Sequence, residues 1–294
     1  EVEGKLPIEE EIKKEFIDTV DWSVSRQMME NLEYLLGDKP LDWLVINHLE
    51  PDHAASIDLI LARWPKVKII STEKGFMLMR QFGFHPDDHD IRIVEEGDTH
   101  CFGGHTVTFI AAPMVHWPEA MVTFDVTNGV LFSADAFGSF IALDGKLFAD
   151  EVNFDRDWID EARRYLVNIV GKYGTQVRAL LKKASGIEID MICPLHGFVW
   201  RKNLGDFIQK YLLWANYLPE ETFSNVYCSK DEGETWSDAK VFLNTDPGEK
   251  FDQYVKQKGI YVTQLGETKS LFYFDVRKQD IITNEGHDQQ WLFA

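Results

Sequence analysis

Hydrophobic and polar residues follow two periods along the first 90 residues, one typical of helices and one typical of strands. Apolar side chains recur at helical spacing in SRQMMENLEYLL (25–36), and the apolar run LDWLVIN (41–47) predicts a buried strand. A second helix is predicted over 53–64, opened by a histidine, and a second strand over 67–71. This alternation of helices and strands indicates a layered α/β domain.

The pattern changes from about residue 91 onward. Short strands joined by tight turns are predicted by IRIVEE, TVTFIAA, AMVTFDV and GVLFSAD. Residues 155–185 predict a pair of helices, 187–194 a strand and 204–218 a further helix. We therefore predict an α/β (α+β) fold in which two sheets pack face to face between layers of helices.

Residues 219–294 differ from the rest. ETFSNVYC, AKVFLN, KGIYVTQL, KSLFYFDV and DIIT predict strands, EKFDQYVKQ a short helix, and His287 a surface loop. We predict one domain over 1–220 and a strand-rich segment over 221–294 that packs on it or completes it. The charged residues before 16 leave a sheet edge open, and an open edge invites aggregation, so we expect the hairpin 259–276 to pair there.

Composition narrows the class of protein. The 294 residues are 45% hydrophobic and 13% aromatic, enough for a sizeable core, and the net charge of −19 argues against nucleic acid and anionic membranes as partners. Three cysteines stand far apart without CxxC spacing, as is usual in a reducing compartment. No apolar run is long enough to span a bilayer and the acidic N-terminus is no signal peptide, so we expect a cytoplasmic protein.

Metal-binding side chains are concentrated in four segments, NHLEPDH, PMVHWPEAM, LFSADAFG and CPLHGFVWR. Their candidate ligands are His48, Glu50, Asp52, His53, His116, Asp135 and His196. Each segment follows a predicted strand, where a rigid element can aim a side chain at a common point. Taken singly, each of the last three residues is more often a core, cap or turn residue. The cluster of four ligands within six positions favours a metal site instead.

These segments resemble the metal-binding motifs of the metallo-β-lactamase superfamily, and specifically those of flavodiiron proteins. Most hydrolases of the superfamily carry H-x-H-x-D-H, whereas this chain has H-L-E-P-D-H, and Glu50 in that position is typical of flavodiiron proteins. HWPEAM, DAFG and HGFVWR match the same family in order and spacing. The resemblance covers roughly residues 16–220 and implies an αββα sandwich of metallo-β-lactamase type.

The resemblance also implies two non-haem iron ions (Fe²⁺/Fe³⁺) with a bridging hydroxide, oxo or peroxo group. One iron would be held by His48, Glu50 and His116, the other by Asp52, His53 and His196, and Asp135 would bridge them. Imidazole and carboxylate ligands without thiolate suit iron or manganese better than structural zinc. Zinc, and with it a hydrolase, remains the alternative that the residues leave open.

Several neighbours of the ligands depart from the usual family pattern. Ala134 and Leu195 stand where many relatives have polar residues, and Ala55 replaces a glycine or serine neighbourhood. Because hydrogen bonds around a metal site tune its ligands, altered turnover is expected. Trp117 is expected to pack over the site, or else to be an ordinary core aromatic.

Flavodiiron proteins carry a C-terminal flavodoxin domain whose FMN supplies electrons to the iron pair. Only 98 residues follow His196, whereas a doubly wound flavodoxin needs on the order of 140 residues and a phosphate-binding loop. The segment 226–237 is acidic and would repel a phosphate. We therefore expect no FMN site, as in the flavodoxin-lacking oxygen-binding diiron proteins that this chain resembles.

Three functions follow in order of preference. The first is dioxygen binding by a sensor of oxygen or iron, acting with a signalling partner such as a chemotaxis receptor, because two ferrous ions lack the electrons to reduce oxygen to water. The second is an oxygen or nitric oxide reductase that receives electrons from a separate flavodoxin or rubredoxin. The third is a zinc-dependent hydrolase. A homodimer is expected in each case.

Overall fold

The structure is a computed structural model that describes residues 13–218 and four later segments, 226–229, 260–265, 268–275 and 280–283. The chain divides into two compact units, Glu1–Asn216 and Tyr217–Ala294. The first unit contains all seven candidate ligands, and the predicted αββα sandwich accounts for its layers.

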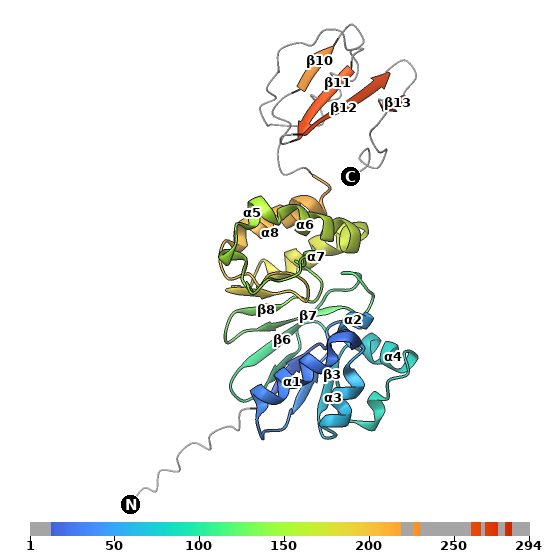
Figure 1. Cartoon of the computed structure of the whole chain (residues 1–294). Helices are drawn as coiled ribbons and strands as arrows, with labels where there is room; N and C mark the ends of the chain where they lie inside the picture. The colour runs from blue at the N-terminus through green and yellow to red at the C-terminus, as the bar shows by residue number, and fades with distance from the viewer. Residues whose placement is uncertain (1–12, 219–225, 230–259, 266–267, 276–279, 284–294) are drawn as a thin grey trace, which may run out of the picture. The chain divides into compact units, whose positions relative to one another are not determined.

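The first sheet of this unit is parallel throughout, in the order β1-β2-β3-β4. Its strands are β1 (Glu15–Ile17), β2 (Trp43–Val45), β3 (Lys68–Ser71) and β4 (Ile91–Ile93). Three helices cover its outer face, namely α1 (Ser25–Leu36), α3 (Ile57–Arg63) and α4 (Glu73–Gln81) (Figure 1). Parallel strands need crossover helices, which explains the helix–strand alternation in this part of the sequence.

The second sheet has five strands in sequence order. They are β5 (Thr99–Cys101), β6 (Thr106–Ala111), β7 (Met121–Asp125), β8 (Val130–Phe132) and β9 (Met191–Cys193). Neighbours are antiparallel from β5 to β8, and β9 then returns parallel to β8. The tight-turn pattern in the sequence corresponds to this antiparallel part, except that β4 belongs to the first sheet.

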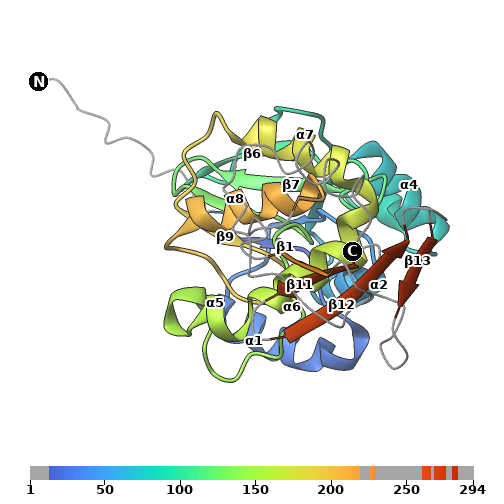
Figure 2. The same cartoon turned by 90° about the horizontal axis from the view of Figure 1, so that it is seen from above.

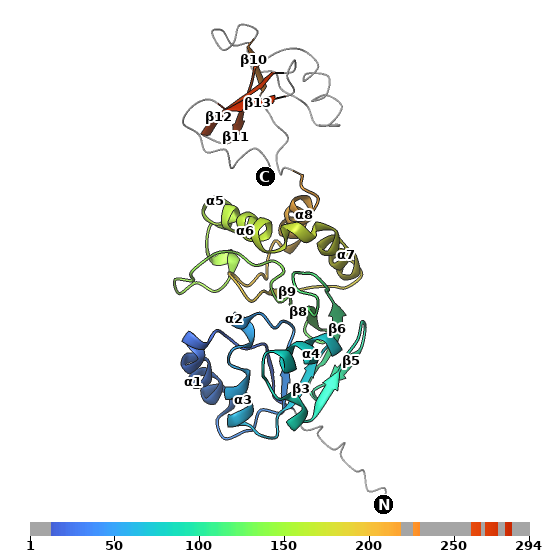
Figure 3. The same cartoon turned by 90° about the vertical axis from the view of Figure 1, so that its right-hand side faces the viewer.

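Alternate residues of the strands face opposite layers. Leu44 and Ile69 pack with helices α1, α3 and α4, whereas Val45 and Ile70 face Phe109 of the second sheet in the core between the sheets. This is the two-residue period of a strand buried on both faces. Figure 3 shows β3 between helices α1 and α3 on one side and strands β5 and β6 on the other.

The outer face of the second sheet is covered by helices from the second half of the unit. These are α5 (Phe154–Asp157), α6 (Ile159–Tyr165), α7 (Gly174–Ala184) and α8 (Leu204–Ala215). Helices α7 and α8 pack side by side (Figure 2). Trp200 and Phe207 stack with ring centroids 3.8 Å apart in this layer, so aromatic packing fixes the start of α8 near the end of the second sheet.

The segment 53–64 is two helices rather than one. Pro51 occupies the first turn of α2 (Pro51–Ala54), a position that suits its fixed φ and missing N–H. Ala55 and Ser56 separate this turn from α3. His53 therefore lies inside a short helix, and the prediction that it opens a helix is wrong. Helix α4 was not predicted, although the side chain of Thr72 caps it by accepting a hydrogen bond from the Gly75 amide.

Short helical turns complete the unit. They are η1 (Trp22–Val24), η2 (Pro86–Asp88), η3 (Ala149–Glu151), the π-helical η4 (Leu166–Val170) and η5 (Gly171–Tyr173). Among the described residues, no helix is long and apolar enough to cross a membrane.

The second unit contains an antiparallel sheet in the order β10-β11-β12-β13. Its strands are β10 (Val226–Ser229), β11 (Ile260–Leu265), β12 (Thr268–Asp275) and β13 (Asp280–Thr283). The predicted hairpin is present as β11 and β12. These strands bond to one another in that sheet, and the expectation that they complete the first domain stays a prediction. That the segment packs on the domain stays a prediction, and 239–244, 249–257 and His287 lie outside the described residues.

Gly197, which follows the predicted ligand His196, should not tolerate a side chain. Its φ is +88°, and a Cβ there would lie 2.0 Å from Ser139 Oγ. We expect Gly197→Ala to lose at least about 1 kcal/mol of unfolding free energy from the left-handed backbone alone, and to displace His196. Denaturant unfolding and metal analysis measure both effects. Gly186→Ala is the control, because nothing lies within 4 Å of its Cβ, and equal stability of the two variants would contradict the prediction.

Candidate metal centre

The structure brings all seven predicted ligands to one end of the two sheets. Parallel strands end at the same edge, which is where such sheets place their binding sites. His48 follows β2 through a short loop, while Asp135 and His196 follow the parallel pair β8 and β9. His116 lies in the connection from β6 to β7. The side chains form two adjacent groups, which are His48, Glu50, His116 and Asp135, and Asp52, His53 and His196.

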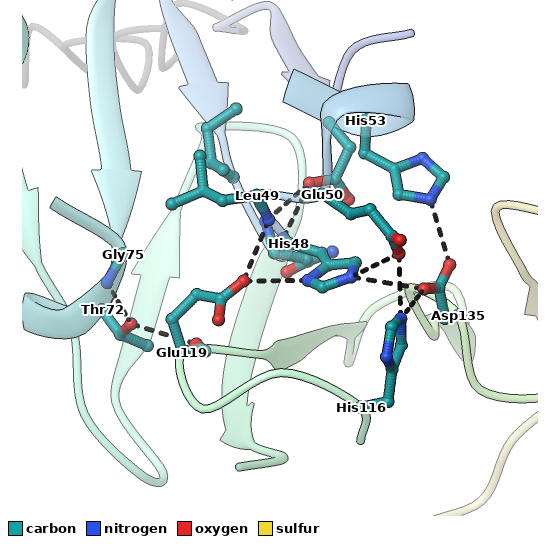
Figure 4. A network of polar contacts seen from close by, with 12 residues as sticks. His48, Leu49, Glu50, His53, Thr72, Gly75, His116, Glu119 and Asp135 are labelled. Atoms are coloured by element: carbon teal, nitrogen blue, oxygen red, sulfur yellow. Dashed lines mark hydrogen bonds and ion pairs between the residues drawn. The ribbon is translucent and has the colours of Figure 1, made fainter. Parts of the chain in front are cut away.

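In the first group, the ligand atoms converge on one point. His116 Nε2 lies 2.9 Å from Glu50 Oε2 and 3.0 Å from Asp135 Oδ2. His48 Nε2 lies 3.3 Å from Asp135 Oδ2 and 3.4 Å from Glu50 Oε2. Figure 4 shows His48, Glu50 and His116 pointing toward one another and toward Asp135. The His48 side chain is fully buried, whereas Glu50 is one-third exposed.

The second group is smaller and more open to solvent. His53 Nε2 and His196 Nε2 lie 3.1 Å apart. Asp52 Oδ2 lies 3.2 Å from His196 Nε2 and 3.5 Å from His53 Nε2. The side chains of His196 and Asp52 are 34% and 39% exposed. A small molecule can therefore approach this group more readily than the buried His48.

Asp135 lies between the two groups and directs one oxygen to each. Its Oδ2 faces His48 and His116 of the first group. Its Oδ1 lies 3.0 Å from His53 Nε2 and 3.5 Å from His196 Nε2. The side chain is 1% exposed. A carboxylate in this arrangement is suited to bridge two cations.

Two buried carboxylates behind the His48 loop were not predicted as functional. Asp18 Oδ1 accepts hydrogen bonds from the amides of Asn47, at 2.7 Å, and His48, at 3.2 Å. Glu119 Oε1 accepts from His48 Nδ1, at 2.9 Å, and from the Leu49 amide, at 3.1 Å. Both acids lie in motifs that the resemblance covers, FIDTVD and HWPEAM, but sequence gives no sign of what they contact.

Aromatic rings contact the histidines of both groups. The Trp117 ring stands perpendicular to that of His48, with centroids 5.4 Å apart. Trp117 therefore packs against the site, as expected, and is not merely a core aromatic away from it. Tyr165, which was not predicted, contacts the second group, with its ring centroid 5.5 Å from that of His196. Burial raises the pKa of Tyr165, and the nearby charge of Asp135 raises it further.

Ala134 and Leu195 join two ligand loops through their backbones. The Leu195 amide donates a 2.9 Å hydrogen bond to the Ala134 carbonyl. This bond ties the residue before Asp135 to the residue before His196. The departure from the family pattern at these positions therefore leaves the link between the loops intact, because the link uses no side chain.

The histidines of the first group hold protons more strongly than an ordinary histidine. Burial alone would lower the pKa of His48, but contacts with Asp135, Glu119 and Glu50 raise it well above its usual value. Burial likewise opposes protonation of His116, but hydrogen bonds to Asp135 and Glu50 raise its pKa to about 9. The cause in both cases is a surplus of carboxylates around the imidazoles.

The carboxylates show the opposite shift. Contacts with His116 and His48 lower the pKa of Glu50 to about 2. Burial acts to raise the pKa of Asp135, but contacts with His116, His48 and His53 hold it far below the usual range. Asp18 differs, because burial dominates and raises its pKa to about 6. Glu50 and Asp135 therefore stay ionised near neutral pH and favour positive charge beside them.

The residues fit a pair of metal ions. His48 Nε2 and Asp52 Oδ1 are buried and have no partner with hydrogen-bond geometry among the described atoms, so a cation would satisfy atoms that the protein leaves unpaired. The ligand atoms of each group lie within 4.8 Å of one another, close to the ~4 Å span across an ion with bonds of about 2.1 Å. Four imidazoles and three carboxylates without thiolate suit iron or manganese.

An αββα sandwich with this site is a metallo-β-lactamase-like metalloprotein. Residues 6–197 match the family model described as "ODP family beta lactamase". The chain therefore belongs to this family, the metallo-β-lactamase-like diiron branch whose relatives are the flavodiiron proteins, as the four motifs predicted. The family implies a non-haem diiron site.

Relatives of known name share this part of the chain. The "Anaerobic nitric oxide reductase flavorubredoxin" of Vibrio vulnificus is 35% identical over 222 residues, which cover 74% of this chain and 44% of the relative. The protein of the same name from Escherichia coli O1:K1 is 35% identical over 220 residues, covering 74% and 45%. This chain thus spans less than half of the length of these relatives.

Solved structures agree on the fold. The flavodiiron protein from Giardia intestinalis superposes with a TM-score of 0.65 at 28% identity, covering 69% of this chain and 49% of that one. Rubredoxin oxygen:oxidoreductase from Desulfovibrio gigas superposes with a TM-score of 0.64 at 30% identity, covering 69% and 51%. The flavorubredoxins are named as nitric oxide reductases and the Desulfovibrio gigas protein as an oxygen oxidoreductase, so the comparisons support the reductase interpretation better than the sensor interpretation.

Iron occupancy of both metal positions should depend on Asp135, whereas Asp52 should affect the occupancy of only the second position. We expect iron-loaded Asp135→Ala to lose most of both irons and Asp52→Ala to keep about one per chain, because a missing ligand weakens the ion it contacts. Metal analysis after gel filtration measures the content. Asp38→Ala, at an exposed position, is the control and should keep both irons. Full occupancy in Asp135→Ala would contradict the assignment.

Iron uptake should release protons near neutral pH, because a histidine must be deprotonated to bind a metal. The pKa of His116 is raised to about 9, so this side chain is protonated at pH 7 and loses its proton as the pH rises through 9. We expect ferrous iron added to chelator-treated protein to release about one to two protons per chain at about pH 7 and fewer at about pH 9.5.

A pH indicator in weakly buffered solution measures this release. Magnesium is the control, because it prefers oxygen ligands and retains its waters, and it should release none. If the same number of protons were released at the two pH values, the metal would not be displacing a proton from His116.

Proposed function

We propose that this chain is the diiron core of a reductase that converts nitric oxide to nitrous oxide, with dioxygen as an alternative substrate. The balanced reaction combines two nitric oxide molecules, two electrons and two protons to give nitrous oxide and water. The observation that carries the proposal is the bridging position of Asp135 between two adjacent ligand groups. A pair of ions held side by side suits a reaction that joins two small molecules.

The first ion would be held by His48, Glu50 and His116, the second by Asp52, His53 and His196, and Asp135 would bridge them. The iron pair, when bound, supplies redox chemistry and open coordination positions. In the first position only Glu50 is about one-third exposed, whereas in the second both His196 and Asp52 are. Substrate would therefore enter beside the second group, while Trp117 covers His48.

Electrons are the second requirement of this reaction. The relatives are named flavorubredoxin and rubredoxin oxygen:oxidoreductase, and these names describe proteins that work with flavin or rubredoxin. In the described part of the second unit the strands form an antiparallel sheet, not the parallel sheet of a flavodoxin. We infer that a flavin- or rubredoxin-type redox module outside this diiron core supplies its electrons.

Steady-state turnover tests the proposal. Iron-loaded protein should consume nitric oxide continuously when a reduced rubredoxin or flavodoxin system is present, at a rate on the order of 10 per second, the median for enzymes. A nitric oxide electrode under anaerobic conditions measures consumption. Iron-treated Asp135→Ala is the control and should give only the background rate.

Two outcomes would contradict the reductase. Oxidation that stops after one round per iron pair, with every donor tried, would favour dioxygen binding without turnover. Hydrolase activity that depends on zinc and exceeds the iron-loaded rates would favour the third function instead.

A further inference from the structure

Glu119 lies on the far side of the His48 ring from Asp135, and its side chain is 1% exposed (Figure 4). It stands in the connection from β6 to β7, three residues after His116. Since its contacts are made with His48 and Leu49, it touches the metal site through one ligand. It is not one of the seven predicted ligands.

We propose that Glu119 is a positioning residue that makes the two metal positions inequivalent. It acts through His48, whose imidazole it holds in one tautomer and one orientation, so that the first position binds metal more tightly and favours the oxidised ion more than the second position does. This inference rests on the ligand assignment proposed above.

The hydrogen bonds fix the tautomer of His48. Glu119 Oε1 already accepts the Leu49 amide at 3.1 Å, so its role toward this loop is that of an acceptor. His48 Nδ1, at 2.9 Å from the same oxygen, is then the nitrogen that carries hydrogen. Once Nε2 has given up its proton, as metal binding requires, its lone pair faces Glu50 and Asp135. A carboxylate behind a metal-binding histidine orients the ring and increases its basicity.

The backbone around Glu119 is held on two sides. Its carbonyl accepts a 3.1 Å hydrogen bond from Thr72 Oγ1, the side chain that caps helix α4 (Figure 4). Two residues later, the Met121 amide donates to the Asn47 carbonyl at 3.1 Å. The backbone at Glu119 is thus fixed to α4 and to the His48 loop at once, which places the side chain where its carboxylate meets His48.

The other three histidines have no comparable acid in the described ion pairs. The carboxylates within range of His53, His116 and His196 are those of the ligands themselves. Among the described contacts, only the first position therefore has an additional buried carboxylate in direct contact with a ligand side chain. Asp18 is also buried and its charge acts on His53 and His48, but its hydrogen bonds are made to backbone amides. Negative charge at short range in a low-dielectric environment favours the more highly charged ion.

The buried charge of Glu119 also needs compensation. Its Oε2 is buried and has no hydrogen-bond partner among the described protein atoms. Burying a carboxylate without a partner is costly unless a positive charge lies nearby. A cation bound to Nε2 on the opposite side of the His48 ring supplies that charge, so the acid and the first metal stabilise each other.

Two substitutions separate the charge from the hydrogen bond. Glu119→Gln keeps an oxygen that can accept from His48 and Leu49 but removes the charge. Glu119→Ala removes both, and Glu30→Gln, at an exposed ion pair on α1, is the matched control. Iron affinities come from chelator competition and midpoint potentials from anaerobic redox titration of the iron-loaded proteins.

We expect Glu119→Ala to weaken one of the two irons by about 10- to 100-fold, the usual effect of losing a partner behind a metal ligand. We expect Glu119→Gln to keep both irons and to raise one midpoint potential. A tenfold change in the preference for the oxidised over the reduced ion equals about 59 mV for one electron. Glu30→Gln should match the wild type in both measurements.

Paired substitutions identify which position responds. When Glu119→Ala is combined with Asp52→Ala, which weakens the second position, the iron that remains at the first position should be lost. When Glu119→Ala is combined with His116→Ala, which weakens the first position, the affinity for the iron that remains at the second position should change little. The inference would be overturned if Glu119→Ala weakened iron binding equally at both positions. It would also be overturned if both Glu119 variants matched the wild type in iron affinity and midpoint potential.

The ligand assignment has a separate outcome. If the wild type fails to bind two irons, the assignment itself fails. If Glu119→Ala does not fold, the potential of Glu119→Gln decides, because a merely structural role would leave that potential unchanged.

Discussion

The position of Asp135 between two sets of histidines is the constraint on which the site depends. Its two oxygens face different groups, so the loop that carries it must be fixed relative to two other loops. The β8–β9 pairing and the bond from Leu195 to Ala134 tie it to His196. The core between the sheets ties it to the β2 loop. Both sheets must therefore be assembled before the site exists.

Buried carboxylates perform a similar task on the first sheet. Asp18 leaves the end of β1 and accepts the amides of Asn47 and His48, and Glu119 accepts the next amide. Three consecutive backbone N–H groups are thus satisfied by acids from two different parts of the chain. A loop whose amides are held in this way can aim its side chains with little freedom.

The sequence predicted the ligands more completely than their surroundings. Strand alternation and helical spacing located most of the sandwich, and the short motifs named all seven side chains that meet. The break at Ala55 and Ser56 was missed because the apolar pattern continues across it while Pro51 starts a separate turn. Glu119 and Asp18 were missed because a hydrogen bond between residues 71 or 30 positions apart leaves no periodic signal.

The charges of the site link metal binding to the stability of the domain. Glu50, Asp52 and Asp135 pair with histidines in the described contacts, and Glu119 pairs with His48. Lysine and arginine take no part in these pairs, and the chain as a whole carries −19. Protons on the histidines can balance the carboxylates, but two divalent ions balance them more fully. Since the unfolded chain lacks this arrangement, ions that bind it stabilise the folded domain by mass action. The same carboxylates that create the metal site therefore make the stability of its loops depend on bound cations.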